Sequence, residues 1–350
     1  MTPLWRHTRR LFLLAMICIA GLAAPSVYVE ATCHGHSTQI DYRPLVAPQH
    51  HRPETRTLMT YPEWYIVHAY DDYARVIGKK DPHHFAYLQA IGGFWSSLCS
   101  LTELSSAHGK IDTATKQMVY VIGTSFTVEL LLKAAYEETL GRLFAGLRGP
   151  TRAPLDDVSA RQAADYATFL QQVPWYKWRF RDDAKELAAR ATGRLRDKER
   201  RIALGIEYGA KAAYARVVAG AVARVGKDDL TLRMIVQDVL PVRLNAITNV
   251  TIIATHSEGL EIETPRYRAL THILNNLAAE NANFVEIAGN DDILFTAISG
   301  DPTIEGAIYS SARQGAKDYR HLVLVKVSDL AENLRLLAQQ GLHLEHIHDY

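Results

Sequence analysis

Residues 217–239 read VVAGAVARVGKDDLTLRMIVQDV, and the change of pattern within this stretch decides how the chain is divided. The part before Gly226 is rich in Ala, Gly and Val and completes a helical pattern that begins near Arg196. The part after Asp229 is dense in β-branched residues with a period of two, which is typical of a strand. We therefore expect a helical domain over residues 60–226 and an α+β domain over residues 227–350.

The region before this boundary shows helical patterns. Thr60 and Glu63 have the spacing of a capping box, and Pro62 stands in the first turn, where its missing N–H costs no hydrogen bond. This predicts a helix from there to about Ile77. Further helices are predicted over residues 81–108, 113–147, 155–172, 182–192 and 196–224. With no convincing strand pattern among them, we expect an all-helical domain.

The region after the boundary alternates strand and helix patterns. Short apolar runs predict strands, and Asn290-Asp291 between two of these runs is a hairpin signal. Helical patterns occupy residues 266–279 and 330–339. This order predicts a small antiparallel sheet with helices on one face, a ferredoxin-like α/β sandwich. The runs are LTLRMIVQDV, NVTIIATHS, NFVEIAG, DILFTAIS and HLVLVKV.

Residues 1–31 have the layout of an export segment. Three arginines at positions 6, 9 and 10 precede an uncharged run that continues to Val29. A signal peptide cut after Ala31 and an uncleaved transmembrane anchor explain this layout equally well. Both place the body of the protein in the cell envelope, facing the periplasm, and the anchor makes the inner membrane a partner.

The next segment, residues 32–59, is rich in Pro, His and Arg and has no hydrophobic period, which predicts a tether between membrane and body. Cys33 opens this segment, and Cys99 lies in the helical domain. Both cysteines fall in the exported part, where they can form a disulfide, but their spacing leaves the pairing open.

One eight-residue pattern occurs twice in the helical domain. Both copies have the form Glu-x-x-x-Lys-Ala-Ala-Tyr, within helices that are rich in apolar residues. Glu and Lys four residues apart share a helix face, so we expect a four-charge cluster where the two helices meet. Such a cluster is either a structural device that fixes the helix register or a ligand-binding or proton-handling site. The candidate residues are Glu129, Lys133, Tyr136, Glu207, Lys211 and Tyr214.

His68 and Asp72 form the second candidate ligand-binding group. A carboxylate four residues after a histidine on one helix can orient the imidazole for acid–base work. A buried histidine with satisfied hydrogen bonds is the simpler interpretation. The chain contains no Gly-x-Ser-x-Gly, His-Glu-x-x-His, Cys-x-x-Cys or phosphate-binding glycine loop. Their absence argues against an enzyme without excluding one, and the sequence assigns no catalytic residue.

Metal ligands gather near both ends of the chain. Cys33, His34 and His36 place three ligand side chains within four residues, and a signal cut before Thr32 would leave Thr-Cys-His, an order that chelates copper or nickel. A flexible His-rich tether is the alternative.

His346 and His348 lie on one face of the last predicted strand. They can hold a metal only if another element supplies a third ligand, and polar residues on a strand face are the simpler interpretation. The sequence thus identifies no definite cofactor or metal.

Four segments carry a resemblance: TYPEWYIVHAYDDYARVI at 60–77, GGFWSSLC at 92–99, the Glu-x-x-x-Lys-Ala-Ala-Tyr helix and VEIAGNDDIL at 285–294. They resemble segments of an uncharacterised family of bacterial proteins with an N-terminal membrane segment, over residues 57–350. The family has no assigned activity. The resemblance therefore implies a membrane-anchored bacterial protein and no catalytic residue.

The composition limits the choice of partner. The chain has 350 residues and a formal charge of +1, so a nucleic-acid partner is not expected. We expect a membrane-anchored or exported envelope protein that binds or interacts with a partner, for example another protein. The alternative is a small-ligand-binding protein or enzyme with its site at the Glu/Lys cluster of the helical domain.

Overall fold

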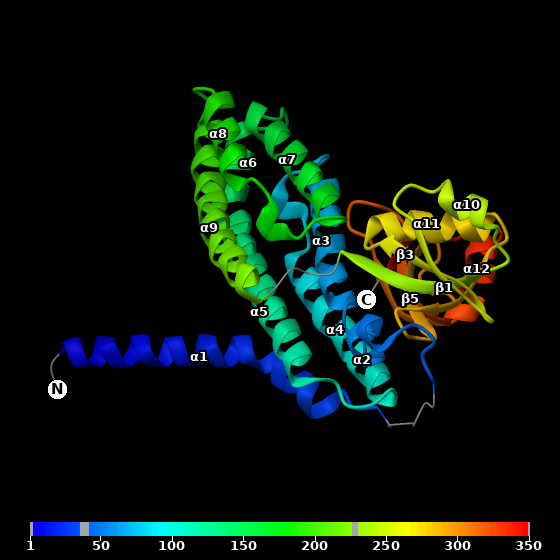
Figure 1. The fold of residues 1–350 in the computed structure, drawn as a ribbon. Helices are drawn as coiled ribbons and strands as arrows, with labels where there is room; N and C mark the ends of the chain where they lie inside the picture. Colours follow the sequence, from blue (N-terminus) through cyan, green and yellow to red (C-terminus); the bar gives the residue numbers. More distant parts are fainter. Residues whose placement is uncertain (1–2, 36–41, 226–229, 349–350) are drawn as a thin grey trace.

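The computed structural model describes residues 3–35, 42–225 and 230–348. Figure 1 shows a long N-terminal helix, α1 (Pro3–Thr32), which projects sideways from the body, then a helical region and an α+β region that lie side by side. A helical region followed by a region of mixed helices and strands is the architecture that the sequence predicts.

The helical region contains two long helices that pack antiparallel, α5 and α9. Contacts from residue 129 to 211 and from 133 to 207 show that the two chains run in opposite directions. A π-helical turn, Glu137–Gly141, joins α5 to α6. The ends of the predicted helices agree within two residues with the structure, except that the helix predicted from Asp81 begins at Tyr87, after a separate 3-10 turn (Pro82–His84). The observed helices are α3 (Tyr61–Ile77), α4 (Tyr87–Ala107), α5 (Thr113–Tyr136), α6 (Arg142–Arg148), α7 (Pro154–Leu170), α8 (Phe180–Arg190) and α9 (Leu195–Val225).

The start of α3 differs from the prediction. A short helix, α2 (Glu54–Leu58), precedes it, and Thr60 already has helical backbone angles, φ −80° and ψ −27°. Its hydroxyl donates to the Thr57 carbonyl at 2.7 Å and makes no N-cap bond. The capping box with Glu63 is therefore wrong, because an N-cap residue needs an extended backbone.

The α+β region has two four-stranded sheets, not the single sheet that the sequence predicts. Their strand orders are β2-β3-β1-β4 and β6-β7-β5-β8, and every neighbouring pair is antiparallel. The first sheet comprises β1 (Thr231–Gln237), β2 (Thr251–His256), β3 (Gly259–Pro265) and β4 (Asn283–Ile287), and the second comprises β5 (Asp292–Ser299), β6 (Ala307–Ala312), β7 (Tyr319–Lys326) and β8 (His343–His348). The helices that lie between these strands along the chain are α10 (Pro241–Asn245), α11 (Arg268–Ala279) and α12 (Val327–Leu336).

The sequence predicts no strand at β3 or β6, and these two additional strands account for this difference. β3 carries Glu261 and Glu263, and β6 is rich in Ala and Ser, so neither has a long β-branched run. The hairpin signal at Asn290-Asp291 is also wrong. It joins β4 to β5, and these strands belong to different sheets.

The predicted tether is packed from Tyr42 onward. The Glu286 carboxylate of β4 accepts hydrogen bonds from the Tyr42 hydroxyl at 2.6 Å and from the backbone N–H groups of Leu45 and Val46 at 2.6 and 2.9 Å. Residues 42–59 are therefore a strap across the α+β region and not a free linker, because a buried carboxylate needs these donors. The preceding residues 36–41 lie outside the described part of the chain.

The second sheet shares a hydrophobic core with the helical region. Leu294 of β5 and Leu322 of β7 pack in one cluster with Phe94 and Leu98 of α4 and Tyr61 of α3. All five side chains are fully buried. The two predicted domains are therefore fused through this core, which fixes the position of α3 against the sheet.

The C-terminal end of α1 is tied to the body. Cys33 forms a disulfide with Cys99 of α4, which resolves the pairing that the sequence leaves open. Val29 is fully buried, and Glu30 accepts hydrogen bonds from Lys116 and Tyr120 of α5 at 2.9 and 2.7 Å. The rest of α1 carries exposed apolar side chains, among them Phe12, Ile17 and Ile19.

Within the described residues, the continuous helical stretch Thr113–Arg148 is long and apolar enough to cross a membrane. This finding rests on length and composition, and core helices of water-soluble proteins have the same properties.

Candidate functional site

Helix α3 carries groups for two separate sites because it packs against neighbours on two sides. Tyr65, Ala69 and Asp72, spaced three or four residues apart, share the face toward α4 and the second sheet. Tyr70 and Tyr73 point to α5 and α9 on the other side.

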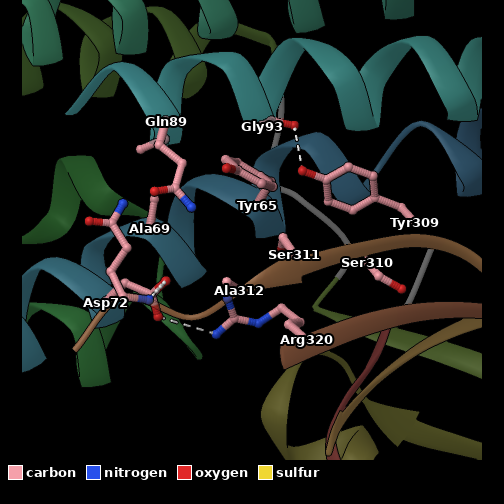
Figure 2. A pocket seen from close by; sticks show the side chains of 12 residues that line it. Tyr65, Ala69, Asp72, Gln89, Gly93, Tyr309, Ser310, Ser311, Ala312 and Arg320 are labelled. Atoms are coloured by element: carbon pink, nitrogen blue, oxygen red, sulfur yellow. Dashed lines mark hydrogen bonds and ion pairs between the residues drawn. The ribbon is translucent and has the colours of Figure 1, made fainter. Parts of the chain in front are cut away.

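A pocket of about 310 Å³ lies between α3, α4 and β6. Figure 2 shows Tyr65, Gln89 and Asp72 extending from the two helices toward Ser311 and Ala312 of the strand. Most of its lining side chains carry a hydroxyl, amide or charged group. The lining residues are Tyr65, Ala69, Asp72, Gln89, Ala90, Gly93, Tyr309, Ser310, Ser311, Ala312, Gln314 and Arg320.

The turn after β6 closes one end of the pocket. The Gln314 side-chain amide accepts from the Ala86 N–H at 2.6 Å and donates to the Ala86 carbonyl at 3.2 Å, and the Gln314 N–H donates to Asp72 Oδ2 at 3.0 Å. At the other end the Tyr309 hydroxyl donates to the Gly93 carbonyl at 3.2 Å (Figure 2). The pocket is thus enclosed by bonds between the helical and α+β regions.

Asp72 and Arg320 form the charged wall of the pocket (Figure 2). Asp72 Oδ1 lies 3.0 Å from Arg75 Nη1 and 3.7 Å from Arg320 Nη2. Arg320 also binds Glu345 through two contacts of 2.5 and 2.7 Å. Burial raises the pKa of Asp72 even though Arg320 and Arg75 oppose it. Burial alone would also raise the pKa of Glu345, but the paired Arg320 guanidinium holds that pKa below its usual range.

His68 lies behind this wall. The sequence predicts that Asp72 orients the His68 ring, but the structure does not show this contact. The His68 Nδ1 atom lies 3.7 Å from Glu345 Oε2, while Asp72 is held by Arg75 and Arg320. Burial, together with the positive charge of Arg320, lowers the pKa of His68 to about 3. The predicted His68–Asp72 pair is therefore wrong, because tertiary contacts outcompete the neighbour on the same helix.

The second site is the Glu/Lys cluster, and its four charges meet as the sequence predicts. Lys133 Nζ lies 3.0 Å from Glu207 Oε1, and Lys211 Nζ lies 2.8 Å from Glu129 Oε1 and 3.0 Å from Glu207 Oε1. Aromatic rings surround them. The Tyr70 hydroxyl donates to Glu129 at 2.8 Å.

The cluster is closed on itself. Burial alone would raise the pKa of Glu207, but Lys133 and Lys211 outweigh it and lower that pKa to about 2. Burial would likewise lower the pKa of Lys211, but Glu129 and other neighbours raise it well above its usual value. The adjoining cavity measures only about 40 Å³, which has room for a few water molecules. This geometry favours the structural interpretation over the ligand-binding one.

The two predicted tyrosines of the repeated pattern lie away from the cluster. The Tyr136 hydroxyl donates to Glu199, and the Tyr214 ring packs 5.2 Å from the Trp175 ring and is about half exposed. Seven residues separate each Tyr from its Glu, which places it roughly 10 Å further along the helix. Tyr70 of α3 and Tyr73, whose ring centre lies 4.5 Å from Lys133 Nζ, surround the charges instead.

Of the predicted N-terminal metal ligands, the structure describes Cys33 and His34, and these two do not form a site. The Cys33 sulfur is bonded to Cys99, so it cannot act as a thiolate ligand. His34 follows it as an exposed residue, and His36 lies outside the described residues. The chelate Thr-Cys-His would also require a cut that separates the buried Val29 from the body.

Sequence reasoning missed the pocket and most of its charged wall. Tyr65, Tyr309, Arg320 and Glu345 come from four elements, and no local spacing connects them. One feature of the sequence could have indicated the charged wall. Arg320 occupies the same face of β7 as Leu322 by strand alternation, and an arginine on an apolar strand face needs a buried partner.

No protein-family model, curated protein or solved structure matches this chain.

Proposed function

We propose that this protein is an envelope protein that is anchored in the inner membrane by α1 and binds a small polar ligand in the pocket between α3, α4 and β6. The observation that carries the proposal is the 310 Å³ pocket, which has polar groups on three sides. Its volume is at the lower end of the roughly 300–1,000 Å³ typical of ligand sites.

The contacts of α1 support an uncleaved anchor. The exposed apolar part of α1 is long enough for a bilayer, and Val29 and Glu30 at its end pack into the body. Cleavage after Ala31 would remove both residues. The Cys33–Cys99 disulfide supports an oxidising compartment such as the periplasm, outside the inner membrane.

The outer face of α5, α6 and α9 supports a position flat against the same membrane. Its apolar side chains are more than half exposed and recur at intervals of eleven residues, about three helical turns, so they share one side of each helix. Lys198, Arg201 and Arg216 of α9 are also exposed and suit anionic headgroups. In Figure 1, α1 runs crosswise to α5 and α9 and extends beyond α9. The apolar residues are Val121, Leu132, Leu143, Ile206 and Val217.

The pocket suits a molecule of monosaccharide or amino-acid size with several hydroxyl or amide groups. Asp72 and the Ser311 and Gln89 side chains offer acceptors and donors, while Tyr65 and Tyr309 offer ring faces. Arg320 is already paired with Glu345 and Asp72, so the wall is not free to neutralise a strong anion. Binding to another protein, which was our first expectation from the sequence, is the second candidate.

We also propose a ferredoxin-like fold for the α+β region. Each sheet has the strand order second-third-first-fourth along its own part of the chain, and the first sheet has helices after its first and third strands. This is the β-α-β-β-α-β arrangement. Two such units in tandem would explain why the structure has two sheets where the sequence predicts one.

Intact-mass analysis of the protein from membrane and periplasmic fractions tests the anchor. We expect the full-length mass in the membrane fraction alone. A soluble mass that begins at Thr32 would contradict the anchor.

Thermal-shift screening of the full chain with monosaccharides, polyols and amino acids tests the pocket. A ligand should raise the melting temperature of the wild type and of Ala114→Trp, which changes an exposed site on α5. It should not raise that of Ala312→Trp, which fills the pocket rim. An equal shift in both variants, or no shift with any of these classes in the wild type, would contradict the proposed site.

A further inference from the structure

Three histidines are buried together where α3 meets β8. His68 lies on α3, and His346 and His348 lie on the same face of the strand, with exposed fractions of 6%, 3% and 0%. The ring centres of His346 and His348 are 5.0 Å apart, and those of His68 and His348 are 6.3 Å apart. The third ligand that the strand pair needs therefore comes from a helix 278 residues away in sequence.

The ring nitrogens are used in an unusual way. His68 Nδ1 faces Glu345 at 3.7 Å, and His346 Nδ1 lies 3.0 Å from the Thr271 hydroxyl. The Nε2 atoms of both rings, and both ring nitrogens of His348, make no hydrogen bond to any residue that the structure describes. A buried polar atom without a partner destabilises the folded state, so four such atoms at one place need an explanation.

This pattern is the one that metal-binding histidines show. A ligating histidine uses one ring nitrogen for the metal and is oriented through the other by a carboxylate, hydroxyl or carbonyl. Thr271 holds this orienting position for His346, and the Glu345 carboxylate faces His68 Nδ1 at 3.7 Å, which is beyond hydrogen-bond length. The His346 ring is further fixed by the Trp64 ring, whose centre is 3.5 Å away.

The spacing of two of the three rings suits one small ion. With Zn–N bonds of about 2.0–2.1 Å, two imidazoles on a tetrahedral zinc have ring centres roughly 5 Å apart. The His346–His348 spacing of 5.0 Å has this value already, whereas the His68–His348 spacing of 6.3 Å is longer and the ring nitrogens of the three histidines do not all lie within 4.8 Å of one another. The His68 ring would therefore have to move toward the other two rings when the ion binds. The Tyr61 ring packs 5.1 Å from the His348 ring, and its hydroxyl also has no hydrogen bond among the described residues.

The backbone of β8 is irregular at this place. Thr296 of β5 pairs with His346, but the next residue, Ala297, pairs with Leu344, so Glu345 is the extra residue of a β-bulge. Bulges re-aim side chains and are common next to functional sites. Here the bulge brings Glu345 to the same side as His346, where it meets both His68 and Arg320.

We propose that His68, His346 and His348 bind a divalent metal ion of borderline softness, with zinc as the first candidate. Imidazole nitrogen suits zinc, copper and nickel, and it does not suit magnesium or calcium. The ion would join α3 to β8 beneath the Arg320 wall of the pocket, so it would hold the helical and α+β regions in register.

Metal analysis of the full chain, purified in detergent with an affinity tag that contains no histidine, tests this proposal. The protein is stripped with chelator, incubated with zinc, freed of excess zinc and measured by elemental mass spectrometry. We expect about one zinc ion per chain in the wild type, and a visible ligand-field spectrum of tetrahedral cobalt when cobalt replaces zinc. Zinc should also raise the melting temperature of the stripped protein.

His348→Gln should lose the bound zinc and the cobalt spectrum, whereas the matched control His343→Ala, an exposed histidine of the same strand, should retain both. Zinc retained by a folded His348→Gln protein, or no zinc in the wild type, would overturn the proposal. If His348→Gln does not fold, X-ray absorption at the zinc edge of the wild type decides, because it counts imidazole ligands directly. Three imidazoles support the site, and one or none overturns it.

Discussion

At the scale of single residues, the Glu/Lys cluster shows which interactions local sequence can predict. Glu and Lys four residues apart had to share a helix face, so Glu129, Lys133, Glu207 and Lys211 could be named from spacing. The partners of His68 and Asp72 could not be predicted from spacing. Each found a stronger partner, Glu345 and Arg320, from strands far along the chain.

Replacing Glu207 by Gln should lower the free energy of unfolding by about 2 kcal/mol, because Lys133 and Lys211 would then share Glu129 alone. This magnitude lies between the losses typical of a broken surface ion pair and of a broken buried one. Chemical denaturation measures this loss. Asp182→Asn, which removes an exposed pair with Lys185, is the control and should change stability by less than about 0.5 kcal/mol. Equal effects of the two substitutions would show that the cluster is not structural.

The same carboxylate predicts a pH dependence. The pKa of Glu207 is lowered to about 2 in the folded protein, against about 4.3 in an unfolded chain, so its contribution is complete above the unfolded value and is lost as the pH falls toward 2. The free energy of unfolding of the wild type should therefore fall more steeply between about pH 4.5 and 2 than that of Glu207→Gln. Parallel curves for the two proteins would contradict this assignment.

At the scale of elements, length and periodicity predicted the helices well and the strands incompletely. Helices α3, α4, α5, α7 and α9 have 17 to 31 residues, so their pattern is repeated several times. β3 and β6 have seven and six residues, and their polar or small side chains hide the alternation. Because these two strands were not predicted, the sequence indicated one sheet where the structure has two.

The disulfide links two elements that the sequence could not join with certainty. Cys33 and Cys99 are 66 residues apart, and a crosslink over such a loop stabilises the fold by about 4 kcal/mol. The double substitution Cys33→Ser and Cys99→Ser should lower the free energy of unfolding by this amount, as measured by urea denaturation without reductant. Cys18→Ser leaves the disulfide in place and serves as the control. A wild-type protein that loses no stability under reductant would contradict the role of this bond.

At the scale of the whole molecule, the outer face of α5, α6 and α9 leaves large apolar side chains exposed, and the proposed membrane anchor α1 would account for them. If α1 spans the bilayer, the side of the body from which it projects faces the membrane (Figure 1). Apolar side chains on that side are then covered by lipid and not by water.

A solvent-sensitive fluorophore tests this orientation. In a Cys18→Ser background, a label on Ile206→Cys of α9 should shift its emission to shorter wavelength when the protein moves from detergent into vesicles with anionic lipid, and lipid-borne quenchers should reach it. A label on Val242→Cys of α10, equally exposed, should show neither effect. Identical behaviour of the two labels would contradict a membrane-facing α9.

The sequence by itself determined the division into helical and α+β regions, the helices, the four charges of the cluster and the apolar N-terminal segment. All of these depend on local periodicity or on short spacings, which physical chemistry converts into structure without knowledge of the rest of the chain. Only the tertiary structure decided the pairing of Cys33, the packing of residues 42–59, the pocket and the group of three histidines. These features join groups that are tens to hundreds of residues apart, and only the burial of α3 against the second sheet brings them together.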